Sequence, residues 1–74
     1  MELIVVTYHR VNSATEVWMK DSGEKVWLRV GEIITFKGSA ILYRGEEILG
    51  NPEMLRERSS PLYKFGQLVA HSSN

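Results

Sequence analysis

The residues best suited to chemistry lie in one short stretch, EVWMKDSGEKVWLR, over 16–29. It holds both tryptophans of the chain, Trp18 and Trp27, each preceded by a valine and followed by an apolar residue and then a base. Indole rings fill protein interfaces or stack on nucleic-acid bases, and neighbouring cations contact carboxylates or phosphates. The stretch therefore indicates recognition of a partner. Its candidate contact residues are Trp18, Trp27, Lys20, Lys25, Arg29 and Glu16.

A turn over 21–24, which contains a Ser-Gly pair, predicts that 15–20 and 25–30 are the two arms of a β-hairpin. In this register Trp18 lies directly opposite Trp27. Directly opposed residues share a face, so we expect the two rings to stack or to pack edge to face, which is worth about 0.5–1.5 kcal/mol. The same face holds the other candidate contact residues, with Lys20 opposite Lys25. The opposite face is predicted to be core and carries Val17, Met19, Val26, Leu28 and Val30.

Three interpretations of the tryptophan pair remain open. The C-terminal segment of the chain offers Leu62, Tyr63, Phe65 and Leu68 as a cover for the rings. The pair can instead form a protein interface, including a self-interface in a homo-oligomer, because exposed tryptophan is enriched at binding hot spots. In the third interpretation the rings stack on bases. Nine basic and nine acidic residues cancel, and this balance disfavours nucleic acid because phosphate binding usually needs a basic excess.

The sequence predicts neither catalysis nor a bound metal or cofactor. It has no cysteine, no glycine-rich phosphate loop and no serine in a nucleophile elbow. His9 and His71 lie far apart and match no metal-ligand spacing. We expect His9 to be a hydrogen-bonded structural residue, and we expect the protein not to be an enzyme.

Turn signals at short intervals predict an antiparallel meander over 1–50. A first strand covers 2–11, and its continuous apolar start suggests burial on both faces. Further strands begin near 33, 40 and 46. The turns between them place three large side chains in one core row across three strands: Phe36, Ile41 and Ile48.

One short helix is predicted near 52–58, because Asn51 suits the N-cap, Pro52 the first helical position and Glu53 the positive end of the dipole. The helix and the turn after it cover 51–60. A possible last strand follows over 61–70, and 71–74 is expected to be a frayed tail.

Seventy-four residues predict a single domain over 1–74. The expected fold is mainly β: a small antiparallel barrel or rolled meander sheet, SH3-like or OB-like in size, with five to six strands and one short helix. The apolar N-terminal run is too short for a membrane span and lacks signal-peptide features, so we expect a cytoplasmic protein without a membrane partner.

The expected function is that of a small non-enzymatic β-barrel binding module that acts by protein–protein interaction, as an accessory subunit, inhibitor or adaptor. Its aromatic-basic sheet face would make the contact. The alternative is a small β-barrel that binds RNA or single-stranded DNA, in which Trp18 and Trp27 stack on bases while Lys20, Lys25 and Arg29 contact phosphates.

Overall fold

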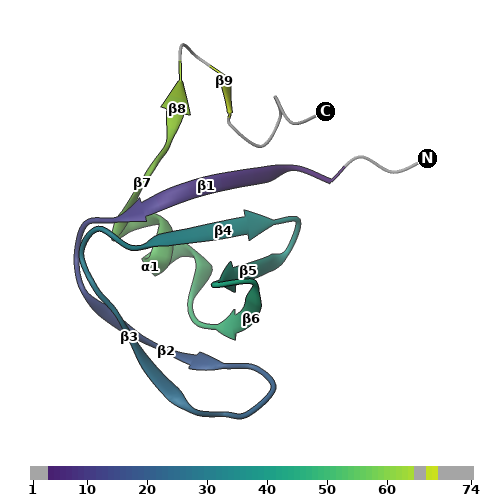
Figure 1. Cartoon of the computed structure of the whole chain (residues 1–74), viewed down its shortest axis with the longest axis vertical. Helices are drawn as coiled ribbons and strands as arrows, with labels where there is room; N and C mark the ends of the chain where they lie inside the picture. Colours follow the sequence, from purple (N-terminus) through teal and green to yellow (C-terminus); the bar gives the residue numbers. More distant parts are fainter. Residues whose placement is uncertain (1–3, 65–66, 69–74) are drawn as a thin grey trace.

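The computed structural model describes residues 4–64 and 67–68, and shows a mainly β chain with one short helix (Figure 1). The elements are β1 (Val6–Val11), β2 (Thr15–Met19), β3 (Lys25–Leu28), β4 (Ile33–Lys37), β5 (Ala40–Tyr43), β6 (Glu46–Leu49), α1 (Pro52–Glu57), β7 (Ser59–Pro61), β8 (Tyr63–Lys64) and β9 (Gln67–Leu68). Seven strands form one antiparallel sheet in the order β3-β2-β6-β5-β4-β1-β7, and β8 pairs with β9. The mainly β prediction is confirmed. The sheet has more strands than the five to six expected, and it is rolled without being closed.

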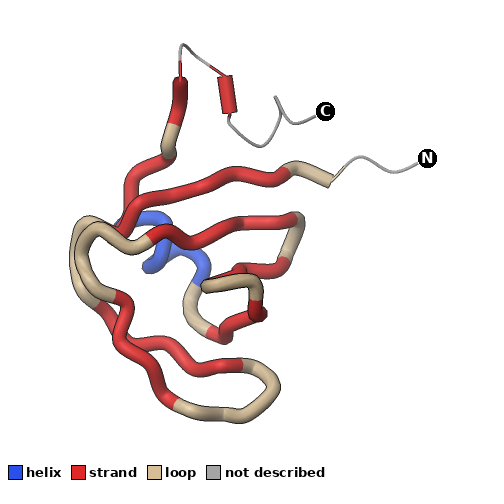
Figure 2. Tube along the Cα trace, viewed as in Figure 1, coloured by secondary structure: helices blue, strands red, loops and turns tan. Residues whose placement is uncertain are grey.

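Four of the strands belong to one long, bent hairpin. Arg10 pairs with Ile33 between β1 and β4, and Thr15 pairs with Leu28 between β2 and β3. The segment from Arg10 to Thr15 is therefore as long as the segment from Leu28 to Ile33. The bend between them is held by hydrogen bonds. The Val11 amide donates to the Glu32 carbonyl at 2.8 Å, and the Gly31 amide donates to the Val11 carbonyl at 2.8 Å. The resulting curve of the chain is clear in Figure 2.

A second hairpin, β5–β6, bridges the two halves of the long one. β5 pairs with β4, and β6 pairs with β2. The predicted core row is confirmed, because Phe36 pairs with Ile41 and Ile41 pairs with Ile48. All three side chains are buried. This row ties β4 to β6 and so fixes the roll of the sheet.

The predicted helix is confirmed as α1. The Asn51 side chain accepts hydrogen bonds from the backbone amides of Glu53 and Met54, and Pro52 occupies the first turn. Leu55 is 1% exposed and packs into the core. Within the described residues, no helix is long and apolar enough to cross a membrane.

Two predictions about the ends of the chain are corrected. Ile4 and Val5 are 57% and 68% exposed, so the first strand is not buried on both faces at its start. β1 begins at Val6, and in the described residues no strand lies on the outer side of Ile4 and Val5 to cover them. The single last strand over 61–70 is replaced by β7, β8 and β9 where the structure describes it. Residues 65–66, 69–70 and the tail over 71–74 lie outside the described residues.

Candidate functional site

The turn of the tryptophan hairpin lies one residue earlier than predicted. The Met19 amide donates to the Glu24 carbonyl at 2.8 Å, and the Gly23 amide donates to the Met19 carbonyl at 2.8 Å. The loop therefore covers 20–23 and ends at Gly23, whose φ of 75° suits glycine and is strained for other residues. In the predicted turn over 21–24 this glycine occupies the third position. The structure needs it at the last.

The shifted turn changes the partners of both tryptophans. Trp18 pairs with Lys25, and Glu16 pairs with Trp27. The predicted direct opposition of Trp18 and Trp27, and of Lys20 and Lys25, is wrong. Because both strands moved by one residue, the two rings keep a common face and are diagonal neighbours. Among the described residues the aromatic pair is His9 with Phe36, so the predicted stack of the two indoles is not formed.

The predicted division into two faces holds for the strands but fails at the bend. Val17 and Leu28 are fully buried, and Met19 and Val26 are half-buried and pack against the core. Val30 is 66% exposed, which contradicts its predicted core position. It lies two residues after the end of β3, where the chain bends and strand alternation no longer sets the side-chain direction.

On the outer side of the hairpin the tryptophans are exposed, Trp18 by 43% and Trp27 by 54%. Leu49 of β6 pairs with Trp18 and is 50% exposed, so it extends the apolar strip. Sequence reasoning missed Leu49 because nothing in the sequence reveals that β6 lies beside β2. We call this surface the tryptophan face. It consists of Glu16, Trp18, Lys25, Trp27 and Leu49, which lie in the strands, together with Lys20 and Arg29, the exposed residues that directly follow β2 and β3.

Carboxylates accompany two of the three cations of the tryptophan face. Lys25 Nζ lies 3.8 Å from Glu16 Oε2, and Lys20 Nζ lies 3.4 Å from Glu47 Oε1. All four side chains are substantially exposed, so each ion pair contributes little to stability. Their effect is on the surface potential, because each pair cancels a positive charge where a phosphate would have to bind.

The outer edge of β3 is unpaired in the described residues. β3 is the end strand of the sheet, beside β2 alone. The hydrogen bond between Met19 and Glu24 fixes the alternation along the pair, so the backbone groups of Val26 and Leu28 face β2. The N–H and C=O groups of Lys25 and Trp27 therefore face outward, away from β2.

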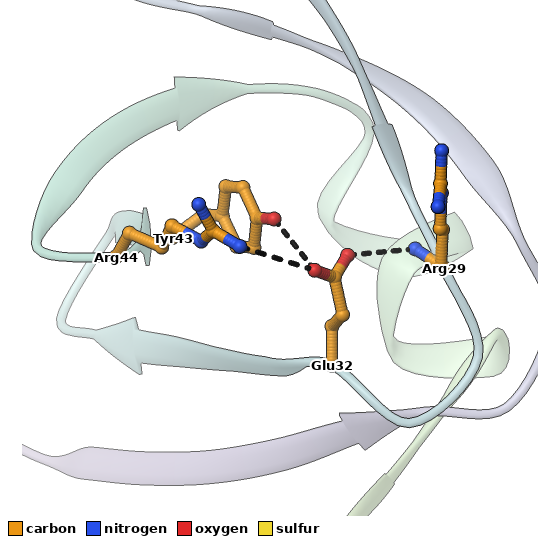
Figure 3. A network of polar contacts seen from close by, with 4 residues as sticks. All are labelled: Arg29, Glu32, Tyr43 and Arg44. Atoms are coloured by element: carbon orange, nitrogen blue, oxygen red, sulfur yellow. Dashed lines mark hydrogen bonds and ion pairs between the residues drawn. The ribbon is translucent and has the colours of Figure 1, made fainter.

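Glu32 joins the end of β3 to the end of β5 (Figure 3). Its Oε1 accepts from the Arg29 amide at 2.8 Å, and its Oε2 accepts from the Tyr43 hydroxyl at 2.7 Å. Arg44 Nη2 lies 3.8 Å from the same Oε2. The Arg29 amide and, next, the Tyr43 hydroxyl lower the pKa of Glu32, while burial and then the Glu32 hydrogen bond raise the pKa of Tyr43. These contacts stabilise the bend. The Arg29 amide is already hydrogen-bonded to Glu32 within the chain.

His9 is buried and hydrogen-bonded, as its sequence position suggested. Its Nδ1 lies 2.9 Å from Ser59 Oγ, and the Ser59 hydroxyl donates to the Leu55 carbonyl at 2.5 Å. Because that hydroxyl proton is committed to Leu55, His9 Nδ1 must be the donor to Ser59. Such a pair cannot activate the serine as a nucleophile. Burial, with a smaller effect of the Arg56 charge, lowers the pKa of His9.

The C-terminal segment does not start beside the tryptophans. The Leu62 amide donates to the Tyr8 carbonyl at 2.8 Å, which places the chain next to β1 at the other end of the sheet. β8 and β9 lie at the top of Figure 1, while β2 and β3 lie at the bottom. Side chains over 63–74 lie outside the described residues, so the predicted cover by Tyr63, Phe65 and Leu68 is not tested beyond this backbone arrangement.

Within the described residues, no group of three or more His, Asp and Glu side chains is arranged to hold a metal ion. Comparisons with protein-family models, with curated proteins and with solved structures find no match to this chain.

Proposed function

We propose that this protein is a small, non-enzymatic β module that works by protein–protein interaction, as an accessory subunit, inhibitor or adaptor. The contact surface is the tryptophan face. The observation that carries this proposal is the exposure of two adjacent tryptophans, by 43% and 54%, beside an exposed Leu49. Large aromatic side chains at the centre of an interface supply most of its binding energy.

The ion pairs favour a protein partner over a nucleic acid. A nucleic-acid surface needs cations that can meet phosphates, and affinity grows with each phosphate that is neutralised. Lys20 and Lys25 each lie beside a carboxylate, and the whole chain has no net charge. A mixed surface of this kind suits the polar rim of a protein interface, with the indoles as its apolar centre.

The test is affinity capture from an extract of the organism that encodes the protein, with purified reconstitution of any captured protein. We expect a protein that binds the wild type and is lost from the Trp18→Ala/Trp27→Ala variant. The matched control is Val30→Ala/Ile33→Ala, which removes exposed apolar side chains outside the tryptophan face and should keep the partner. Equal loss from both variants would contradict the proposal.

A titration with single-stranded and duplex oligonucleotides at two salt concentrations tests the alternative. The proposal expects no binding at low salt. Micromolar binding would replace protein by nucleic acid as the partner if it falls steeply with salt, with a log–log slope of about −2 to −3 for three phosphate contacts. Tryptophan fluorescence reports this directly, because stacking on a base quenches the indoles.

A further inference from the structure

The open part of the β3 edge is short and has a boundary at each end. Lys25 and Trp27 point their backbone N–H and C=O groups outward. The next outward amide, that of Arg29, already donates to Glu32 Oε1 at 2.8 Å. At the other end, the next outward position is Gly23, which belongs to the turn and whose amide already donates to the Met19 carbonyl at 2.8 Å. Among the described residues, Lys25 and Trp27, two positions apart, therefore remain for pairing with another strand.

This spacing is self-complementary. In an antiparallel pair of two such edges, Lys25 of one copy lies opposite Trp27 of the other, and each pair exchanges two backbone hydrogen bonds. We infer that β3 pairs with β3 of a second copy of this chain, with the two-fold axis passing between the two Val26 residues. Such a contact is isologous and closed, so it makes a dimer and not a fibre.

Charge selects this register over the adjacent one. A shift that placed Trp27 opposite Trp27 would set Lys25 opposite Arg29 of the second copy, where like charges repel and the Arg29 amide is already bonded. In the inferred register, Lys25 lies in a row between Trp18 of its own chain and Trp27 of the second copy. In this row the methylene stem of Lys25 covers apolar indole surface while its ammonium group stays beside Glu16.

Lys25 would normally protect an edge strand from pairing, because a strand that approaches must bury its charge. Here its ammonium group is directed back over its own sheet, 3.8 Å from Glu16. The charge therefore does not stand in the path of a second strand. Pairing would also join two tryptophan faces into one continuous surface. This inference goes beyond the proposed function and needs no foreign partner.

Single-cysteine cross-linking tests the register, because the chain has no cysteine of its own. Val26 faces Val26 of the second copy as a non-hydrogen-bonded pair, whose Cα atoms lie about 4.5 Å apart, within disulfide range. Trp27 lies diagonal to its own counterpart, about 7–8 Å away. We expect Val26→Cys to form an oxidised dimer much faster than Trp27→Cys. The reverse order, or equal rates, would overturn the register.

Sedimentation equilibrium of the isolated protein tests the dimer. We expect reversible, weak dimerisation, because so small a contact belongs to the transient class of interfaces. Lys25→Glu should raise the Kd about tenfold or more, and Lys25→Glu/Trp27→Lys should restore dimerisation by placing opposite charges across the two strands. A wild type that stays monomeric at about 1 mM would overturn the inference. Such a result would leave the tryptophan face intact as a site for a foreign partner.

Discussion

The two edge strands of the sheet, β3 and β7, are similar in length but differ in what they leave exposed. β7 pairs with β1 through hydrogen bonds from the Leu62 amide to the Tyr8 carbonyl and from the Asn12 amide to the Arg58 carbonyl. The backbone groups of Ser59 and Pro61 therefore point away from β1. Pro61 has no N–H group to offer another strand. Ser59 is buried and bonded to His9 and to the Leu55 carbonyl. The β7 edge is therefore built for stability.

β3 is built differently. Its outward residues, Lys25 and Trp27, keep both backbone groups unpaired in the described part of the chain, and Trp27 is 54% exposed. Among the described residues, α1 contacts β7 more extensively than β3. Leu28 of β3 is buried in the core, as Leu55 is beside β7, so the two ends differ in the exposed residues of β3, which belong to the proposed contact surface. Substitutions of buried residues beside β7 should therefore lower stability, whereas substitutions of exposed residues of β3 should lower binding.

The largest difference is expected between Leu55→Ala and Trp27→Ala. Leu55 is 1% exposed beside β7, and its loss should lower the free energy of unfolding by about 2–5 kcal/mol through transfer and cavity terms. Trp27→Ala should cost below about 1 kcal/mol, because half of the ring already faces solvent. Urea denaturation measures both. Equal losses of unfolding free energy in the two variants would contradict the difference between the β7 end and the β3 end of the sheet.

Ser59→Ala sharpens the comparison within β7. It removes the acceptor of the His9 Nδ1 proton and leaves a buried donor without a partner, which should cost about 1–3 kcal/mol. Ser60→Ala is the matched control, since Ser60 is exposed and accepts only from the Asn12 side chain at the surface. Thermal unfolding of the two variants should differ clearly. A Ser60→Ala loss as large as that of Ser59→Ala would contradict the role given to His9 and Ser59.

A change of pH is expected to alter the stability of the fold less than these substitutions do. Because the pKa of His9 is lowered in the folded state, the unfolded chain binds a proton first as pH falls. Stability is then complete above the unfolded pKa of about 6.5 and declines as pH falls from there toward the folded value. Urea midpoints measured between about pH 7.5 and 5 should show this slope.

His9→Asn tests the assignment of that slope. Asparagine keeps a donor near Ser59 but has no titrating ring, so the variant should be less stable and its stability should depend less on pH in this window. His71→Ala is the second histidine control. If the slope survives in His9→Asn and disappears in His71→Ala, the proposed linkage to His9 is wrong.

The sequence predicted the parts of the fold that local rules determine. Asn51, Pro52 and Glu53 marked the start of α1, and glycine-containing turns set the row of Phe36, Ile41 and Ile48. It did not predict that β6 lies beside β2 or that β7 lies beside β1. These contacts depend on how the long hairpin bends, and no short pattern records that bend.

The common face of Trp18 and Trp27 was predicted, but the register of their strands and the neighbouring Leu49 were not. Alternation along each strand placed Trp18 and Trp27 on one face, and a two-residue difference in register preserved that result. The predicted direct pairing of Trp18 with Trp27 was wrong. Gly23 occupies the last position of the turn, so the turn lies one residue earlier than predicted. The free edge of β3 could not be read from sequence, because it depends on which strands end the sheet.

Amide hydrogen exchange along β3, followed by NMR, tests the open edge most directly. In dilute protein the amides of Lys25 and Trp27 should exchange rapidly, while those of Val26 and Leu28, which bond to β2, should be protected. At high concentration, protection should rise selectively at Lys25 and Trp27. Slow exchange of Lys25 and Trp27 in the most dilute sample would contradict the account, because their backbone groups would then already be paired within the chain.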